Sequence, residues 1–237
     1  SSFFRYFSNY KCDPKSLESV LSAAYCIIFV TVELISGKTI KTQLKIKKPV
    51  DFKSLVSRDI NTKNVDIITQ PGNDYKIFMN PMKCSLEFIF NNAQPEEAIA
   101  TAMICDRLFP YECSLLYEQK WDMLSKIEKD ELFSNLASFL KFIGDERVHA
   151  TWCRIALKTE KFESNTELFD LLKEMATFFL NNDYSNKDEQ ITASYIQFIH
   201  EFTQSTELIT QYLDKIDNEM KVKTSEIYPK ISDFTTI

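Results

Sequence analysis

The 237-residue chain is 44% hydrophobic and 26% charged, as expected of a protein that folds around a core, so a disordered polar chain is excluded. A net charge of -6 argues against general nucleic-acid binding. The three glycines are widely spaced, which excludes glycine-rich nucleotide-binding loops. Six cysteines with irregular spacing and no CxxC pair indicate free thiols in a reducing compartment, so we expect a cytoplasmic or nuclear protein.

The N-terminal part predicts a helix followed by strands. Asp13 and Pro14 form an N-cap and first-turn pair, and the apolar residues that follow to Ala24 have helical spacing. Tyr25 to Ile35 is rich in β-branched and aromatic residues, Ser36-Gly37 is a turn, and Thr39 to Lys47 alternates strictly. This pattern predicts a β-hairpin. Asp51 to Arg58 could add a helical turn or two.

Further strands are expected between the hairpin and residue 94. The sequence predicts them at Val65–Thr69, Tyr75–Met79 and Ser85–Phe90. We therefore expect an α+β fold in residues 1–94, with Asn91, Asn92 and Pro95 marking a boundary near residues 91 to 96. No apolar run approaches the roughly 18 residues of a membrane-spanning helix, so no membrane span is expected.

Residues 95–237 predict a helical bundle. Pro110 and Pro229 enclose nearly 120 residues with no proline, a stretch that suits uninterrupted helices. Apolar residues three or four apart predict seven antiparallel helices, and Ser164 with Glu167 suggests a capping box before the stripe from Leu168 to Phe179. The nineteen phenylalanines indicate a phenylalanine-rich core or a phenylalanine-lined contact surface, and we favour the core, Phe178 included.

The last predicted helix begins near Thr206 and is amphipathic. Its apolar stripe is Ile209, Tyr212, Leu213, Ile216 and Met220. Two interpretations are open for this stripe: it closes the core of its own chain, which we favour, or it contacts a partner helix.

Groups that could carry chemistry are few. Asp145, His149 and Cys153 share one helix face, but ligands at successive steps of four residues climb about 6 Å each, so all three could not hold one ion. We interpret them as an N-cap, a half-buried histidine and a core thiol. His200 should lie at the edge of an apolar stripe. We therefore expect no catalytic residue, no metal and no cofactor.

One segment is strongly basic. Ser36 to Lys63 carries eight basic and two acidic residues, a charge of +6 that leaves -12 for the rest of the chain. In the predicted hairpin, Lys41, Lys45 and Lys47 share one face, with Lys48 beside them. This face is either an ordinary solvated strand face or a docking site for an acidic protein, a phosphoinositide or RNA.

The sequence favours a non-catalytic adaptor or a subunit of a larger intracellular assembly. Its expected partners are other proteins, with self-association as an alternative. A polyanion-binding module that uses the basic residues 36–63 is the first rival, with Lys41, Lys45, Lys47 and Lys48 as its binding residues. An enzyme with a scattered site is the second rival.

Overall fold

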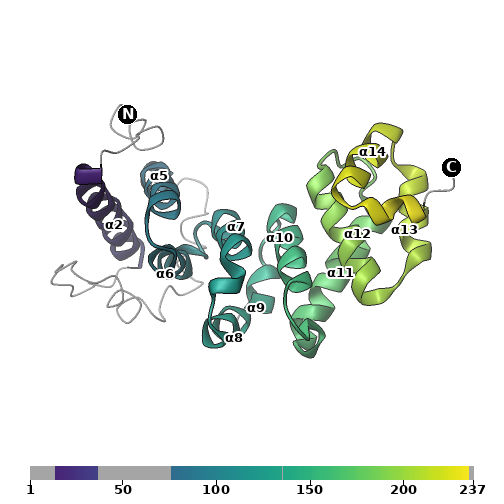
Figure 1. Ribbon diagram of the computed structural model, residues 1–237, viewed down its shortest axis with the longest axis horizontal. Coiled ribbons are helices and arrows are strands. Elements are labelled where there is room, and N and C mark those ends of the chain that lie inside the picture. The colour runs from purple at the N-terminus through teal and green to yellow at the C-terminus, as the bar shows by residue number, and fades with distance from the viewer. Residues whose placement is uncertain (1–13, 37–75, 135, 235–237) are drawn as a thin grey trace. The chain divides into compact units, whose positions relative to one another are not determined.

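The computed structural model describes residues 14–36, 76–134 and 136–234. The chain divides into two compact units, residues 1–120 and 121–237. The expected division between residues 94 and 95 falls inside the first unit and stays a prediction. Within the described ranges, every regular element is an α-helix or a short 3-10 helix (Figure 1).

The described helices of the first unit are α2, α5, α6 and α7, which span Pro14–Ser36, Lys76–Asn92, Pro95–Cys105 and Pro110–Lys120. Helix α2 packs on α5, α5 on α6, and α6 on α7. Two polar contacts join helices that are not neighbours in sequence. The Tyr25 hydroxyl donates to Glu97 at 2.8 Å, and Lys83 pairs with Glu112 at 2.6 Å.

The α+β prediction for the N-terminal part is wrong where the structure describes that part. Tyr25–Ile35 continues helix α2, and the segments expected as strands at Tyr75–Met79 and Ser85–Phe90 fall almost wholly within α5. The buried residues Ala24, Ile28 and Thr31 lie four and three apart, which is the spacing of a helix face packed on α5. Tertiary packing thus overrides β-propensity. The segments at 39–47, 51–58 and 65–69 lie outside the described residues.

The second unit confirms the expected helical bundle. It begins with η1 (Trp121–Met123), α8 (Lys126–Ser134), α9 (Leu136–Leu140), α10 (Glu146–Leu157) and η2 (Phe162–Ser164). It continues with α11 (Thr166–Asn182), α12 (Glu189–Thr203), α13 (Thr206–Lys215), α14 (Asn218–Ile227) and η3 (Pro229–Asp233). Helix α12 is the centre of this unit, because α10, α11, α13 and α14 all pack against it (Figure 1).

Aromatic side chains fill much of this second core. One chain of ring contacts runs from Trp121 through Phe133 to Phe162, with centroids 5.5 and 5.7 Å apart. Another joins Phe179 to Tyr195 at 4.7 Å and to Tyr212 at 5.9 Å. Aromatic pairs at these separations add to the stability gained from burial alone. Most of the phenylalanines in this unit therefore pack as the sequence predicted.

Acidic caps fix the ends of several helices. Asp145 accepts a hydrogen bond from the Arg147 amide and begins α10, as expected. The expected box at Ser164 and Glu167 is wrong, because Ser164 belongs to η2 and α11 begins after Asn165 without a side-chain cap. A reciprocal box forms instead at Ser125 and Glu128, where each amide donates to the side chain of the other at 3.3 Å or less.

The amphipathic stripe at the C-terminus is divided between two helices. Ile216 is extended, with a ψ of 158°, and Asp217 caps α14 by accepting from the Met220 amide at 2.8 Å. All five stripe residues are nonetheless buried, with at most 5% exposure. The interpretation of the stripe as core is therefore confirmed, while the single long helix is corrected to α13 and α14.

Candidate protein-interaction surface

The outer side of α11 carries an open depression of about 410 Å³. Residues three or four positions apart line it, and together they form what we call the α11 face: Asp170, Lys173, Glu174, Thr177, Phe178 and Asn181. Asn182 extends the lining at the end of the helix. This spacing places all of them on one side of an α-helix.

The opposite side of α11 is the core side. Leu168, Leu172, Ala176 and Leu180 recur at intervals of four and are at most 3% exposed. Helices α9, α10, α12 and α13 all pack against α11. The sequence therefore orients the helix by its apolar period, and the α11 face is left outside the core of this unit.

Phe178 is the apolar centre of the α11 face. It is 69% exposed, whereas the next residue, Phe179, is 2% exposed and packs against Tyr195 and Tyr212. The expectation that Phe178 belongs to the core stripe is wrong. An exposed phenylalanine offers a partner a large, rigid apolar surface, and aromatic residues are enriched at the centres of interfaces.

The polar groups of the α11 face are mostly hydrogen-bond acceptors. No ion pair within the described ranges engages Asp170, Lys173 or Glu174. The amide nitrogens of Asn181 and Asn182 donate to their own helix, to the Thr177 and Phe178 carbonyls at 3.0 and 2.8 Å. Their amide oxygens keep lone pairs for an external donor. Two carboxylates and two amide oxygens thus lie beside a single lysine.

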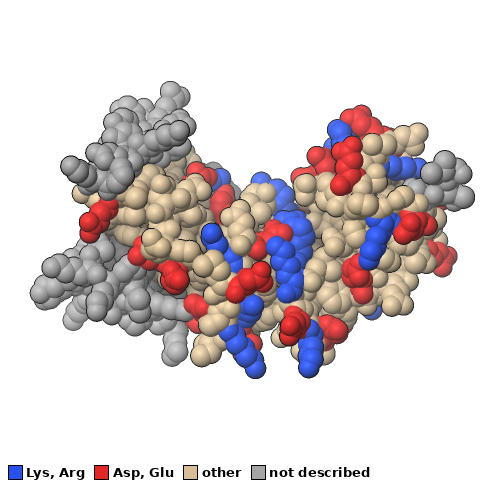
Figure 2. Space-filling model, in the orientation of Figure 1, with Lys and Arg blue, Asp and Glu red and all other residues tan. Residues whose placement is uncertain are grey.

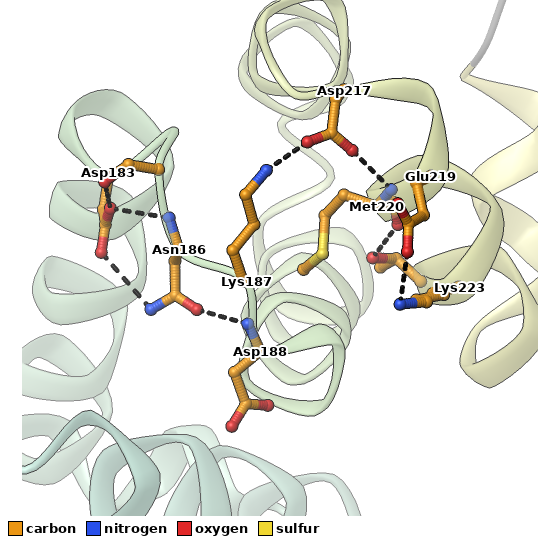
Figure 3. Close-up of polar contacts among 10 residues, drawn as sticks. Asp183, Asn186, Lys187, Asp188, Asp217, Glu219, Met220 and Lys223 are labelled. Atoms are coloured by element: carbon orange, nitrogen blue, oxygen red, sulfur yellow. Dashed lines mark hydrogen bonds and ion pairs between the residues drawn. The ribbon is translucent and has the colours of Figure 1, made fainter.

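A fixed loop adjoins the C-terminal end of α11 (Figure 3). Asp183 accepts from the Asn186 amide at 3.1 Å, and the Asn186 side chain accepts from the Asp188 amide at 2.8 Å. Lys187 pairs with Asp217, the cap of α14, so the loop is tied to a second helix. A surface beside a preorganised loop loses less conformational entropy when a partner binds.

Glu146 of α10 is also held at this loop. Asn186 donates to it at 3.1 Å, and burial together with the nearby Asp183 carboxylate raises the pKa of Glu146. The Tyr184 ring lies under the Lys215 ammonium at 4.4 Å, and the same lysine donates to the Tyr184 hydroxyl at 2.9 Å. Contacts from α10, α13 and α14 thus converge on the segment between α11 and α12.

The group of Asp145, His149 and Cys153 behaves as core and cap. His149 is 8% exposed, its Nε2 lies 3.3 Å from the Leu140 carbonyl oxygen, and burial lowers its pKa. Cys153 is fully buried, which raises the pKa of its thiol. Within the part of the chain that the structure describes, no three His, Cys, Asp or Glu side chains are grouped to hold a metal ion. Asp145 caps helix α10, and His149 and Cys153 are buried along it.

His200 fastens the C-terminal segment to α12. Its Nδ1 lies 2.5 Å from the Tyr228 hydroxyl, which donates to Glu201 at 3.0 Å, and Lys230 donates to the same carboxylate oxygen at 2.8 Å. The Tyr228 hydroxyl thus bridges the His200 ring and the Glu201 carboxylate. The cluster joins α12 to η3.

The predicted basic site is untested. Lys41, Lys45, Lys47 and Lys48 lie outside the described residues, so their role as partner-binding residues stays a prediction. The five cysteines of the described ranges are free thiols.

Sequence patterns missed the α11 face because two adjacent phenylalanines end one apolar stripe, and periodicity alone does not decide which of them points outward.

No described helix combines the length and the apolar character needed to cross a bilayer. On the face in view, acidic and basic side chains are interspersed with uncharged surface over the second unit (Figure 2). No protein-family model matches the chain, and no curated protein or solved structure shows a significant match to it. Function is therefore inferred from the residues themselves.

Proposed function

We propose that the protein is a non-catalytic adaptor or a subunit of a larger assembly, and that the α11 face is a surface through which it binds another protein. The observation that supports this is the depression of about 410 Å³ beside Phe178, a residue that is 69% exposed. A partner that covers this ring removes a large apolar area from water, which is the main source of free energy in protein association.

The helical scaffold suits this role. Helix α11 is held in place by Phe179 on its core side and by the Asp183–Asp188 loop at its end. The side chains of the α11 face are therefore presented on a rigid element and can be replaced without loss of core packing. This separation of the contact residues from the core residues makes the proposal testable by point substitution.

The test is affinity capture from the native source with the full chain and two variants. Phe178→Asp removes the apolar centre of the α11 face and adds a charge. Phe142→Asp makes the same change at a residue that is 88% exposed in the turn before α10. Circular dichroism and thermal melting must first show that both variants fold.

We expect a stoichiometric partner to remain with the wild type and with Phe142→Asp, and to be lost with Phe178→Asp. Equal retention by all three chains would show that binding occurs elsewhere. A turnover activity of the pure protein with no co-purifying partner would favour the enzyme alternative instead.

A further inference from the structure

The chemistry of the α11 face specifies the charge of its partner. Asp170 and Glu174 are exposed carboxylates, and the Asn181 and Asn182 oxygens are additional acceptors. Lys173 is the one positive group among the residues that line the depression. Acceptors that become buried at an interface need donors from the other side, because an unsatisfied buried polar group costs free energy. The partner must therefore supply several donors.

The electrostatic surroundings favour positively charged donors. Residues 163–219 contain twelve acidic and three basic residues, a net charge of -9 that ion pairs of Glu167, Glu201 and Glu219 with lysines outside this range reduce to -6. Of the three lysines inside the range, Lys187 pairs with Asp217 and Lys215 contacts Tyr184. The depression also extends to the C-terminal end of α11, where the helix dipole is negative. The excess of acidic residues and the helix dipole both make the electrostatic potential at the α11 face negative.

We infer that the α11 face binds a lysine- or arginine-rich segment of a partner protein, one apolar side chain of which packs on Phe178. This inference rests on the proposed function and specifies its partner. From Asp170 to Asn181 the α11 face extends about 16 Å along the helix axis, which is the length of about three turns of a partner helix. A basic amphipathic segment of that length would place donors on both carboxylates and an apolar side chain one turn further along α11, on Phe178.

The experiment uses the full chain and two labelled synthetic peptides. The first is a 16-residue peptide with leucines at helical spacing and lysines at its other positions, and the second has glutamate in place of every lysine. Fluorescence anisotropy at low and at physiological salt measures binding. The double substitution Asp170→Asn/Glu174→Gln removes the two carboxylates, and Phe178→Ala removes the ring.

Two matched controls make the same chemical changes elsewhere. Glu160→Gln/Glu226→Gln changes the net charge by the same amount at exposed residues off the α11 face. Phe142→Ala removes an exposed ring from a different turn. These controls separate binding at the α11 face from general attraction between an acidic protein and a cationic peptide.

We expect the lysine peptide to bind with a salt-dependent affinity. The Asp170→Asn/Glu174→Gln variant should bind it roughly 2- to 30-fold more weakly, as two exposed ion pairs predict, and Phe178→Ala should cost about tenfold. The control variants should bind as the wild type does.

The outcomes against the inference are distinct from those against the proposed function. If the glutamate peptide binds as tightly as the lysine peptide and still needs Phe178, the docking surface stands and its charge preference is refuted. If the lysine peptide does not bind, or binds all variants equally, the basic partner is refuted. If Phe178 affects neither peptide nor the captured partner, the α11 face is not the docking surface.

Discussion

Removal of the C-terminal helices should unfold the second unit. A chain that ends before Thr206 lacks α13, which packs on α11 and α12, α14, which packs on α12, and η3, which packs on α14. Seven large side chains lost in this truncation are at most 6% exposed in the intact chain: Ile209, Tyr212, Leu213, Ile216, Met220, Tyr228 and Ile231. The truncation also exposes the ring of Phe179, which packs on Tyr212.

The size of the effect follows from burial. Each of these side chains contributes roughly 1.5 to 3 kcal/mol when it is fully buried, so their removal costs about 10 to 20 kcal/mol. A folded domain is stable by only about 5 to 15 kcal/mol. The loss therefore equals or exceeds the whole free energy of unfolding, and the truncated second unit should be insoluble or lack fixed tertiary packing.

Thermal unfolding monitored by circular dichroism in the near and far ultraviolet measures the stability of the truncated chain. A matched pair of point substitutions in the full chain calibrates the size of the loss. Leu213→Ala, at a fully buried residue, should cost about 2 to 5 kcal/mol. Val222→Ala, at a residue that is 58% exposed, should stay within about 0.5 kcal/mol. A truncated chain whose remaining helices melt cooperatively at the original temperature would refute the assignment of α13 and α14 to the core.

Three further predictions concern smaller changes. Tyr212→Phe should leave the stability to urea unchanged or raise it, because within the described part of the chain the buried Tyr212 hydroxyl lies near Thr192 without hydrogen-bond geometry. The pKa of Glu201 is lowered, first by the hydrogen bond from Lys230, so its stabilising effect is present above the ordinary value of 4.5 and is lost as the pH falls below it. Glu201→Gln should therefore be less stable than the wild type at pH 7, and melts at decreasing pH should show this difference shrinking. Salt-dependent binding to phosphoinositide vesicles or RNA, if the basic segment provides it, should vanish when glutamate replaces Lys41, Lys45 and Lys47; binding that survives the substitution contradicts the prediction.

The helices of the second unit could be predicted from the sequence because local signals and packing agree there. Asp145 begins α10 as an N-cap, and the apolar stripes of α11 and α12 face the core at helical spacing. The helix boundaries could not all be predicted. The extended Ile216 and the Asp217 cap break a stripe that reads as one continuous helix, because Ile216 and Met220 remain buried on either side of the break.

The prediction of strands in the N-terminal part is wrong for a physical reason. Tyr25–Ile35 is rich in residues that favour strands, yet Ala24, Ile28 and Thr31 also repeat with the period of a helix, and packing against α5 selects the helix. Pro81 lies inside helix α5, but in the sequence it resembles the break between two strands. A proline inside a helix removes one backbone hydrogen bond, and contacts with α2 and α6 support the helix on both sides.

The α11 face could not be predicted because it depends on a choice between adjacent residues. Both Phe178 and Phe179 fit an apolar stripe, and only the positions of Tyr195 and Tyr212, which come from α12 and α13, decide that Phe179 turns inward. Tertiary contacts from distant segments thus fix which ring meets solvent. The same contacts separate two roles on one helix: Phe179 supports the core, whereas Phe178 can be replaced without disturbing it. Changes in binding caused by substitution at residue 178 therefore report on the surface itself and not on the stability of the unit behind it.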